Sequence, residues 1–364
     1  MDGSRLAHWE TRMVDSYAMR PADLAVFRIL YASYVLVSVV PVAAWLPRAP
    51  QAFFNPPIGP AALFTSPPRA EVLIGLNVLL AWFAAMLLVG WRTRLASIGS
   101  GLTLIVLDAW AYSLGHISHD ILLVIAPLVL AFSTWGRAWS VDGAGESPNT
   151  RNDTAAGPMC LLAMLVAFAM LTAGWAKATH GWLDPRLKCT FGHLVYHYMF
   201  IGRETWGARW AFHLQSGVWW KSLDWATVAL ELSFFPAVLS RRAFCLMLAI
   251  AAIFHLGVLL LFNISFASNV IVYGAFVRYA QVVGIRTLSF DARGCRGKAA
   301  VIFTAALAVG LVGALGKHSV AAILRLPADD LIVWAGAITG VVFLAQRSFV
   351  PFYRNRLCSP GFPA

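Results

Sequence analysis

The sequence predicts an all-α, polytopic membrane protein with about eight to ten transmembrane helices and additional interfacial helices. The chain is 59% hydrophobic and only 12% charged, and its mean hydropathy is +0.70, which excludes an ordinary soluble globular protein. Apolar stretches long enough to cross a bilayer recur along it. The polar start leads directly into the first of these stretches, which predicts that no signal peptide is cleaved.

Each apolar stretch has close to the roughly 20 residues that a bilayer requires. We expect spans at 22–46, 71–90, 95–114, 118–136, 157–177, 223–240, 243–263, 268–284, 299–316 and 329–346. Residues 1–20 are expected to form an amphipathic segment on the membrane surface. The predicted domains are this segment, a transmembrane domain over 21–284, and further spans with a short tail over 285–364.

The distribution of Lys and Arg predicts the orientation in the membrane. With the N-terminus in the cytoplasm, seventeen of the 28 Lys and Arg residues fall on the cytoplasmic side and ten on the other. The sequence therefore predicts that both termini are cytoplasmic. The net charge of +11 is interpreted as basic loops that face anionic lipid, and not as a nucleic-acid surface.

The long outer segment 178–222 is rich in Trp, Tyr, His and Phe, and short amphipathic helices at the membrane interface are expected there. The five cysteines are scattered, with no spacing typical of a metal site, so neither a disulfide framework nor a bound metal is predicted.

Lys177 is the first candidate for chemistry. It follows the apolar run Met159–Thr172 and a small Ala-Gly pair, with Trp175 and Trp182 on either side. A lysine at the edge of the hydrocarbon is either an anchor whose amine reaches the interface or a working base. Desolvation disfavours its charged form, and this makes such a lysine usable as a general base near neutral pH. The residues alone favour neither alternative.

Other ionisable groups inside the predicted spans each need a reason, because a charge costs about 2.5–3.5 kcal/mol on insertion scales. Asp108 is predicted either to form a structural ion pair or to orient a histidine, and Glu231 either to be a neutral hydrogen-bonded acid or to relay protons. His255 alone would be structural. The complete set of these candidates is Arg28, Asp108, Asp120, Lys177, Glu231 and His255. His116 and His119 are three residues apart, which suits a pair of metal ligands, but no third ligand converges on them.

Several stretches together resemble the membrane domain of vitamin K-dependent γ-glutamyl carboxylase and its bacterial relatives, the horizontally transferred transmembrane (HTTM) domain proteins. Their order and spacing cover most of the first 280 residues. The stretches are Pro21-Ala-Asp-Leu-Ala-Val-Phe-Arg-Ile29, His119 with Trp139-Ser-Val-Asp-Gly143, Ala173-Gly-Trp-Ala-Lys177 with Gly181-Trp182, and Phe254-His255 with Leu261-Phe-Asn-Ile264 and Phe266.

The resemblance implies a role for each of three residues. Lys177 lies where the carboxylase has the base that deprotonates reduced vitamin K. His119 and His255 lie where histidines assist at, and line, the same region. It also implies that Trp175, Trp182, Asp108 and Asn263 contribute to the quinol site. Dioxygen and carbon dioxide are the implied co-substrates, and a peptidyl glutamate is the group that the carboxylase modifies.

The chain also departs from the carboxylase. Trp175-Ala176 precede Lys177 where the carboxylase has a second lysine, and further spans stand where it has a lumenal β-rich domain. No module for propeptide recognition is therefore expected, and a carboxylated product is not required by the resemblance.

The sequence-based hypothesis is a carboxylase-like or epoxidase-like membrane enzyme of the lyase type. The resemblance to bacterial proteins implies a bacterial inner membrane. The protein would bind reduced vitamin K or menaquinol on its extracytoplasmic side, with membrane lipid and a peptide or protein substrate as partners. The alternative is a non-enzymatic membrane partner or peptide-maturation protein with a lipid- or peptide-binding cavity. A transporter is less favoured, because no internal repeat is apparent.

Overall fold

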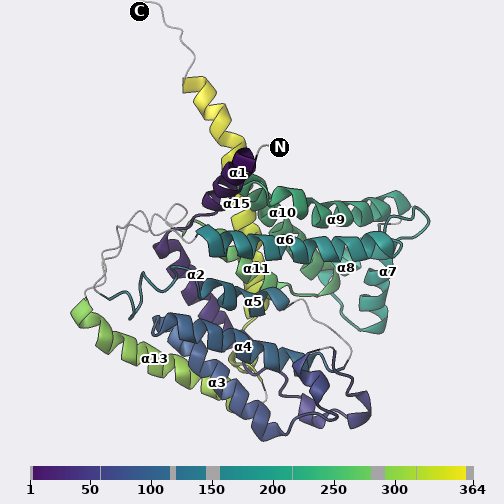
Figure 1. The fold of residues 1–364 in the computed structure, drawn as a ribbon. Helices are drawn as coiled ribbons and strands as arrows, with labels where there is room; N and C mark the ends of the chain where they lie inside the picture. The colour runs from purple at the N-terminus through teal and green to yellow at the C-terminus, as the bar shows by residue number, and fades with distance from the viewer. Residues whose placement is uncertain are drawn as a thin grey trace, which may run out of the picture. The chain divides into compact units, whose positions relative to one another are not determined.

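The computed structural model describes residues 3–57, 59–114, 120–144, 156–214, 216–279, 292–316 and 318–357. All regular secondary structure in these ranges is helical, apart from an isolated bridge between Asn55 and Leu114 (Figure 1). The predicted all-α fold is confirmed.

Within the described residues, seven helices are long and apolar enough to cross a membrane. Their bounds agree with seven of the predicted spans to within a few residues at most ends. They are α2 with its π-helical continuation η1 (Pro21–Val39), α3 (Ala70–Val89), α4 (Thr93–Ala111), α6 (Ala156–Thr179), α10 (Arg241–Phe262), the Gly297–Leu315 part of α13, and the Ala328–Gln346 part of α15.

The other three predicted spans differ from the structure. The segment 118–136 contains only the ten-residue α5 (Ile121–Leu130), and 268–284 contains α11 (Ala267–Tyr273) and η6 (Gly274–Phe276), with 280–284 outside the described residues. In place of 223–240, α9 runs over Gly217–Ala237 and is 21 residues long. It carries Lys221, Asp224 and Glu231, and these charges distinguish it from the seven apolar helices.

The first span also ends earlier than expected, at Val39 instead of residue 46. Pro41 lies two residues further on, and a proline cannot continue the hydrogen bonding of a helix. The residues after it form the short 3-10 turns η2 (Leu46–Arg48), η3 (Gln51–Phe53) and η4 (Pro60–Leu63).

The chain divides into two compact units. The first comprises Met1–Leu165 and Ile271–Ala328, and it includes α1 (Gly3–Ser16), α13 (Ala292–Leu315) and α14 (Val320–Ile323). Helices α3, α4 and α13 lie side by side (Figure 1). A Cβ added at Gly310 of α13 would lie 2.6 Å from the Cβ of Ala81 in α3, so glycine allows these two helices to pack closely.

A buried arginine fixes the loop that follows α5. Arg28 of α2 is fully buried, and its Nη1 donates to the carbonyls of Trp135 at 2.6 Å and Ala138 at 3.2 Å, while Nη2 donates to the carbonyl of Trp139. From the sequence, a cation this far inside the first span is expected to reach the interface or to pair with an acid. The structure instead shows the guanidinium hydrogen-bonded to backbone carbonyls, for which its several donors suit it.

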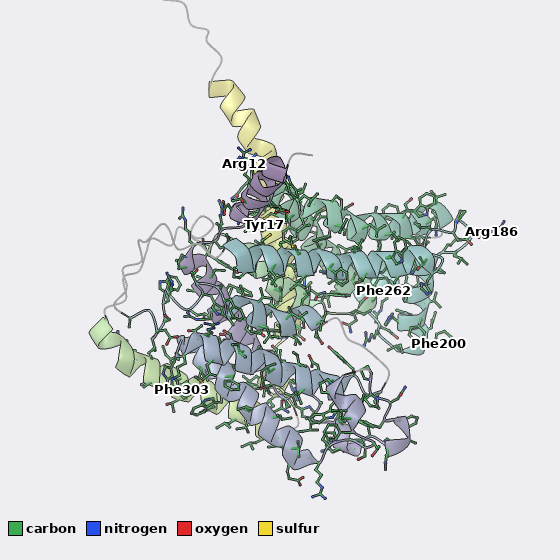
Figure 2. The ribbon with its side chains drawn as sticks, in the orientation of Figure 1. Arg12, Tyr17, Arg186, Phe200, Phe262 and Phe303 are labelled. Atoms are coloured by element: carbon green, nitrogen blue, oxygen red, sulfur yellow. The ribbon has the colours of Figure 1, made fainter. Side chains whose placement is uncertain are left out.

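The second unit comprises Val166–Val270 and Asp329–Ala364. It contains most of α6 together with α7 (Cys189–Val195), η5 (Tyr196–Phe200), α8 (Trp206–Ala211), α9, α10 and most of α15 (Ala328–Leu357). The short elements agree with the short helices predicted for 178–222. One buried core cluster of this unit consists of Leu194, Ala208, Ala211, Trp220 and Phe262. Phe262 lies inside the unit, whereas Phe200 is 77% exposed (Figure 2).

The units do not follow the predicted domain boundaries at 20 and 284, which rest on the family resemblance and stay a prediction. The direction in which the helices cross the membrane also stays a prediction from the distribution of Lys and Arg.

Candidate functional site

The end of α6 folds an aromatic ring back over Lys177. Gly181 has φ +88°, in the left-handed region that favours glycine, and it reverses the chain after the helix. The N–H of Trp182 donates to the carbonyl of Lys177 at 3.3 Å, as in a glycine-terminated helix end. The Nζ of Lys177 then lies 5.6 Å from the centroid of the Trp182 ring, within the range of a cation–π contact.

Lys177 points into the protein and pairs with Glu231 of α9. Its Nζ lies 2.7 Å from Oε1 and 2.8 Å from Oε2 of the carboxylate. The side chain of Lys177 is 26% exposed and that of Glu231 only 9%. The amine is therefore held by a buried acid, and this geometry does not match an anchor whose ammonium group reaches freely into the lipid interface.

A glycine permits this pairing. Gly174 lies about one helical turn before Lys177, and a Cβ added there would be 2.9 Å from the Cβ of Glu231 and 3.1 Å from two atoms of Leu232. Real Cβ atoms essentially never approach so closely, so α9 can lie against α6 at this point only because residue 174 has no side chain. Gly174 thus helps to set the distance between the amine of Lys177 and the carboxylate of Glu231.

Two histidines continue the aromatic surface beyond Trp182. The ring of His193 in α7 lies 5.7 Å from that of Trp182, and the ring of His197 lies 6.4 Å from His193 and 6.1 Å from Phe262. These side chains form a row of flat rings that begins at Lys177.

The environment disfavours the charged form of both histidines. Partial desolvation, with a smaller contribution from the positive charge of Lys177, lowers the pKa of His193, which keeps part of its surface exposed. Desolvation and then the charge of Arg203 lower the pKa of His197. Both rings are therefore neutral at physiological pH, when each can donate one hydrogen bond and accept another.

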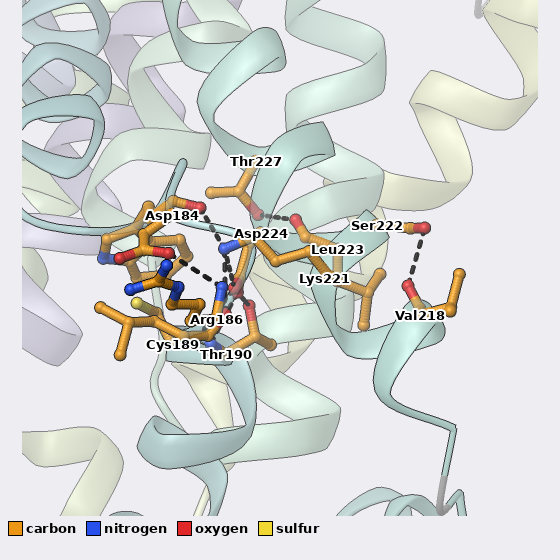
Figure 3. Close-up of polar contacts among 12 residues, drawn as sticks. Asp184, Arg186, Cys189, Thr190, Val218, Lys221, Ser222, Leu223, Asp224 and Thr227 are labelled. Atoms are coloured by element: carbon orange, nitrogen blue, oxygen red, sulfur yellow. Dashed lines mark hydrogen bonds and ion pairs between the residues drawn. The ribbon is translucent and has the colours of Figure 1, made fainter.

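A second charged pair holds the segment that carries Trp182 and α7. Lys221 Nζ donates to the carbonyls of Trp182 at 2.6 Å and Leu187 at 3.0 Å, and to Asp224 at 3.2 Å. The Asp224 carboxylate accepts from the backbone N–H groups of Cys189 at 3.0 Å and Thr190 at 2.7 Å, and from the Thr190 hydroxyl at 2.6 Å (Figure 3). It satisfies N–H groups at the start of α7, as a capping residue does.

Three other predicted residues of this unit lie elsewhere in it. Trp175 is 65% exposed and, two residues before Lys177, projects from nearly the opposite face of α6. His255 is buried in α10 and stacks on Phe266, with centroids 4.5 Å apart and planes at 14°. Asn263 ends α10 in the left-handed conformation, with φ +51°, and is exposed, and its carbonyl accepts from Arg203 at 3.4 Å.

The remaining two predicted site residues are not in this unit. Asp108 is partly buried in α4 of the first unit. His119 and His116 lie outside the described residues. Among the predicted site residues, the structure brings Lys177 and Trp182 into contact. The roles assigned to the others stay predictions; these residues are Trp175, His119, His255, Asp108 and Asn263.

Sequence reasoning missed four participants and one pairing. Glu231 and Lys177 are both recognisable in the sequence, but their contact with each other was not predicted. His193, His197 and the pair Lys221–Asp224 were hidden in or near the long aromatic segment. A signal for the last pair is present, because two opposite charges three residues apart in the first part of a helix share one face of it. In the part of the chain that the structure describes, no group of three or more His, Cys, Asp or Glu side chains is placed to hold a metal ion.

The fold and this site define a polytopic α-helical membrane protein in which a lysine and a glutamate pair between two helices, beside a row of aromatic rings. A family model for the HTTM domain matches residues 17–279, so the chain belongs to the HTTM-domain family, a family of membrane domains linked to the vitamin K-dependent carboxylase. This confirms the resemblance seen in the sequence. Comparisons with curated proteins and with solved structures find no match.

Proposed function

We propose that this protein oxidises a reduced quinone with dioxygen and that Lys177 is the base that accepts a proton from the quinol hydroxyl. The observation that carries the proposal is the bidentate contact between Lys177 and Glu231, 2.7 and 2.8 Å long, beside the Trp182 ring. A lysine and a carboxylic acid in one hydrogen bond can exchange a proton without moving.

The ion pair is one of two protonation states of this contact. In water the ammonium carboxylate is strongly favoured, but removal of water from both groups penalises the charges and favours the neutral amine and the neutral acid. Glu231 is 9% exposed, so a ligand that covers the partly exposed Lys177 completes the desolvation. Glu231 then holds one proton, and the free amine of Lys177 accepts another.

The residues present suit a reduced quinone. Trp182 and His193 offer ring faces for a flat aromatic ligand, and Lys177 supplies a polar group at one end of this row. Bound reduced vitamin K or menaquinol would supply an acidic hydroxyl and the electrons for reduction of dioxygen. Overall, one hydroquinone and one dioxygen would give one quinone epoxide and one water.

Coupling to a second substrate is the less specific part of the proposal. In the carboxylase the same oxidation removes a proton from a peptidyl glutamate, which then takes up carbon dioxide. A peptide or protein substrate of this chain, carboxylated or otherwise modified, fits the family relationship.

The test is epoxide formation by purified protein. Wild type, Lys177→Ala and Lys188→Ala are reconstituted in nanodiscs with reduced vitamin K or menaquinol, dioxygen and bicarbonate, and the quinone products are separated by chromatography. Lys188 is an exposed lysine in the same segment and serves as the matched control. We expect epoxide from wild type and Lys188→Ala, and a loss of about 100-fold or more in Lys177→Ala, as for removal of a general base.

Equal epoxide in wild type and Lys177→Ala would contradict the proposal, as would its absence from wild type with both quinols. In the second case the pair would be a structural link inside a non-enzymatic membrane partner or maturation protein. Elution and thermal unfolding of each variant show that a loss of product is not a loss of folded protein.

A further inference from the structure

The first unit contains an open cavity that has no part in the proposed reaction. Its volume is about 380 Å³. It lies where the start of α4 meets the loop after α5, and its walls are Thr93, Arg94, Ala131, Phe132, Ser133, Trp135, Gly136, Arg137, Asp142 and Gly143.

The cavity is positively charged at its rim. Arg94 and Arg137 both line it and both are exposed. Among the described residues that line it, the acidic one is Asp142, and its carboxylate accepts from the backbone N–H groups of Arg92 at 2.8 Å and Thr93 at 2.7 Å and from the Thr93 hydroxyl at 2.8 Å. Asp142 thus holds the loop on α4, and two arginines line the same cavity.

The backbone of the lining loop is held by hydrogen bonds to buried and partly buried side chains. Trp135 is 1% exposed, and its carbonyl accepts from the buried Arg28. The Ser140 hydroxyl donates to the Gly136 carbonyl at 2.5 Å and accepts from the N–H of Gly143 at 2.9 Å. Because these hydrogen bonds already order the loop, a ligand that binds in the cavity loses less free energy to ordering it.

Exposed aromatic rings lie beside Arg94 and beside Arg92, which is close to it in the sequence. The guanidinium of Arg94 lies 4.8 Å from the ring centroid of Phe132, which is 64% exposed, and that of Arg92 lies 5.9 Å from the ring of Trp91. Aromatic rings at helix ends are typical of the depth of lipid headgroups. The predicted orientation puts this end of α4 on the cytoplasmic side, where the membrane surface is anionic.

We propose that this cavity binds the phosphate of an anionic phospholipid between Arg94 and Arg137. Arginine is the residue best suited to phosphate oxygens, because its planar group donates two parallel hydrogen bonds. Phe132 would contact the glycerol and the upper acyl chains. A soluble phosphate ester shares the headgroup chemistry but makes no use of the exposed ring, which is why the lipid is the source that we favour.

The test measures lipid retained by the full-length protein. Protein in neutral detergent is titrated with phosphatidylglycerol or with phosphatidylcholine, and bound lipid is counted by native mass spectrometry. Wild type is compared with Arg94→Gln, Arg137→Gln and Arg92→Gln. Arg92→Gln removes the same charge from the same surface at a residue that does not line the cavity.

We expect phosphatidylglycerol to bind preferentially, and Arg94→Gln and Arg137→Gln each to weaken it about tenfold, with less than a twofold effect of Arg92→Gln. Equal effects of the three substitutions would overturn the proposal in favour of general surface charge. Displacement of the lipid by millimolar glycerol phosphate would overturn the choice of a lipid. Quinol oxidation is not read in this test, so its outcome is independent of the proposed reaction.

Discussion

Two cations, one in each unit of the molecule, are held in opposite ways. Arg28 in the first unit is fully buried and donates to the backbone carbonyls of Trp135, Ala138 and Trp139. Lys177 in the second unit is 26% exposed and contacts a side chain that can itself carry a proton, Glu231.

The two sets of partners differ in whether they can exchange a proton with the cation. An arginine does not give up its proton in a protein, and carbonyl oxygens cannot take one, so the contacts of Arg28 can only hold the chain in place. A lysine next to a glutamate has two protonation states of comparable energy once water is excluded. Arg28 in the first unit therefore holds a loop, whereas Lys177 in the second unit is the cation to which the proposed function assigns a reaction.

The largest expected effect is the loss of stability when Arg28 is replaced. Arg28→Met removes three hydrogen bonds and leaves buried carbonyls without a donor, which should destabilise the first unit by about 4 kcal/mol or more. Arg28→Lys should rescue little, because a single ammonium cannot span three carbonyls. Thermal unfolding of the detergent-purified variants measures this, with the exposed Arg48→Met as the control. A shift equal to that of the control would contradict the role given to Arg28.

The second prediction tests whether the Lys177–Glu231 pair, unlike Arg28, matters more for activity than for stability. Lys177→Met leaves a buried acid that can protonate, and Glu231→Gln leaves an amine that reaches water, so each should cost about 2 kcal/mol or less. The double variant should regain most of that stability while epoxide formation stays lost in all three. A double-mutant cycle of unfolding free energies measures the coupling. Activity that returns together with stability would show that the pair acts only through structure.

The third prediction concerns the close approach of α6 and α9. Gly174→Ala places a Cβ about 2.9 Å from that of Glu231, and the strain should outweigh the gain in helix propensity, for a net loss of about 1 kcal/mol. Gly192→Ala in α7 meets nothing within 4 Å and should be neutral or slightly stabilising. Opposite signs in thermal unfolding are expected. A stabilised Gly174→Ala would mean that the two helices separate readily.

The smallest effect is a pH dependence from His193. Its pKa is lowered in the folded state, so the folded protein binds fewer protons than the unfolded chain between the two pKa values. The contribution of His193 to stability is therefore complete above about pH 6.5, the ordinary value for histidine, and decreases as the pH falls from there toward the folded-state pKa. Thermal midpoints from pH 7.5 to 5 should fall less steeply in His193→Gln. An unchanged slope would contradict the lowered pKa.

Much of the fold was predictable because hydrocarbon imposes a simple rule on composition. Long runs such as 71–90 and 243–263 have one stable structure in a bilayer, and the structure has helices there. The rule fails where length and polarity disagree. The first span ends near Pro41, earlier than its apolar composition predicts. Helix α9 is long enough to be a span, but its charged residues set it apart from the apolar helices.

The candidate site was predictable only in part. Lys177 and Trp182 are recognisable because they lie in one short motif with Gly181. The partner of Lys177 lies 54 residues away, and no local pattern indicates which acid an amine will meet. The positions of His193 and His197 could not be predicted from the sequence either. Their rings are placed by the short helix α7 and the residues after it, and the start of α7 is held by hydrogen bonds to Asp224.

The charges of α9 also have a consequence for how the chain enters the membrane. An isolated helix with an acid in its middle is a poor candidate for release into lipid, since such a group costs about 2.5–3.5 kcal/mol there. The contact with Lys177 of α6 offsets part of that cost for Glu231, and Lys221 and Asp224 pair with each other on the same helix. Because α6 precedes α9 in the chain, the partner of Glu231 is already made when α9 is synthesised.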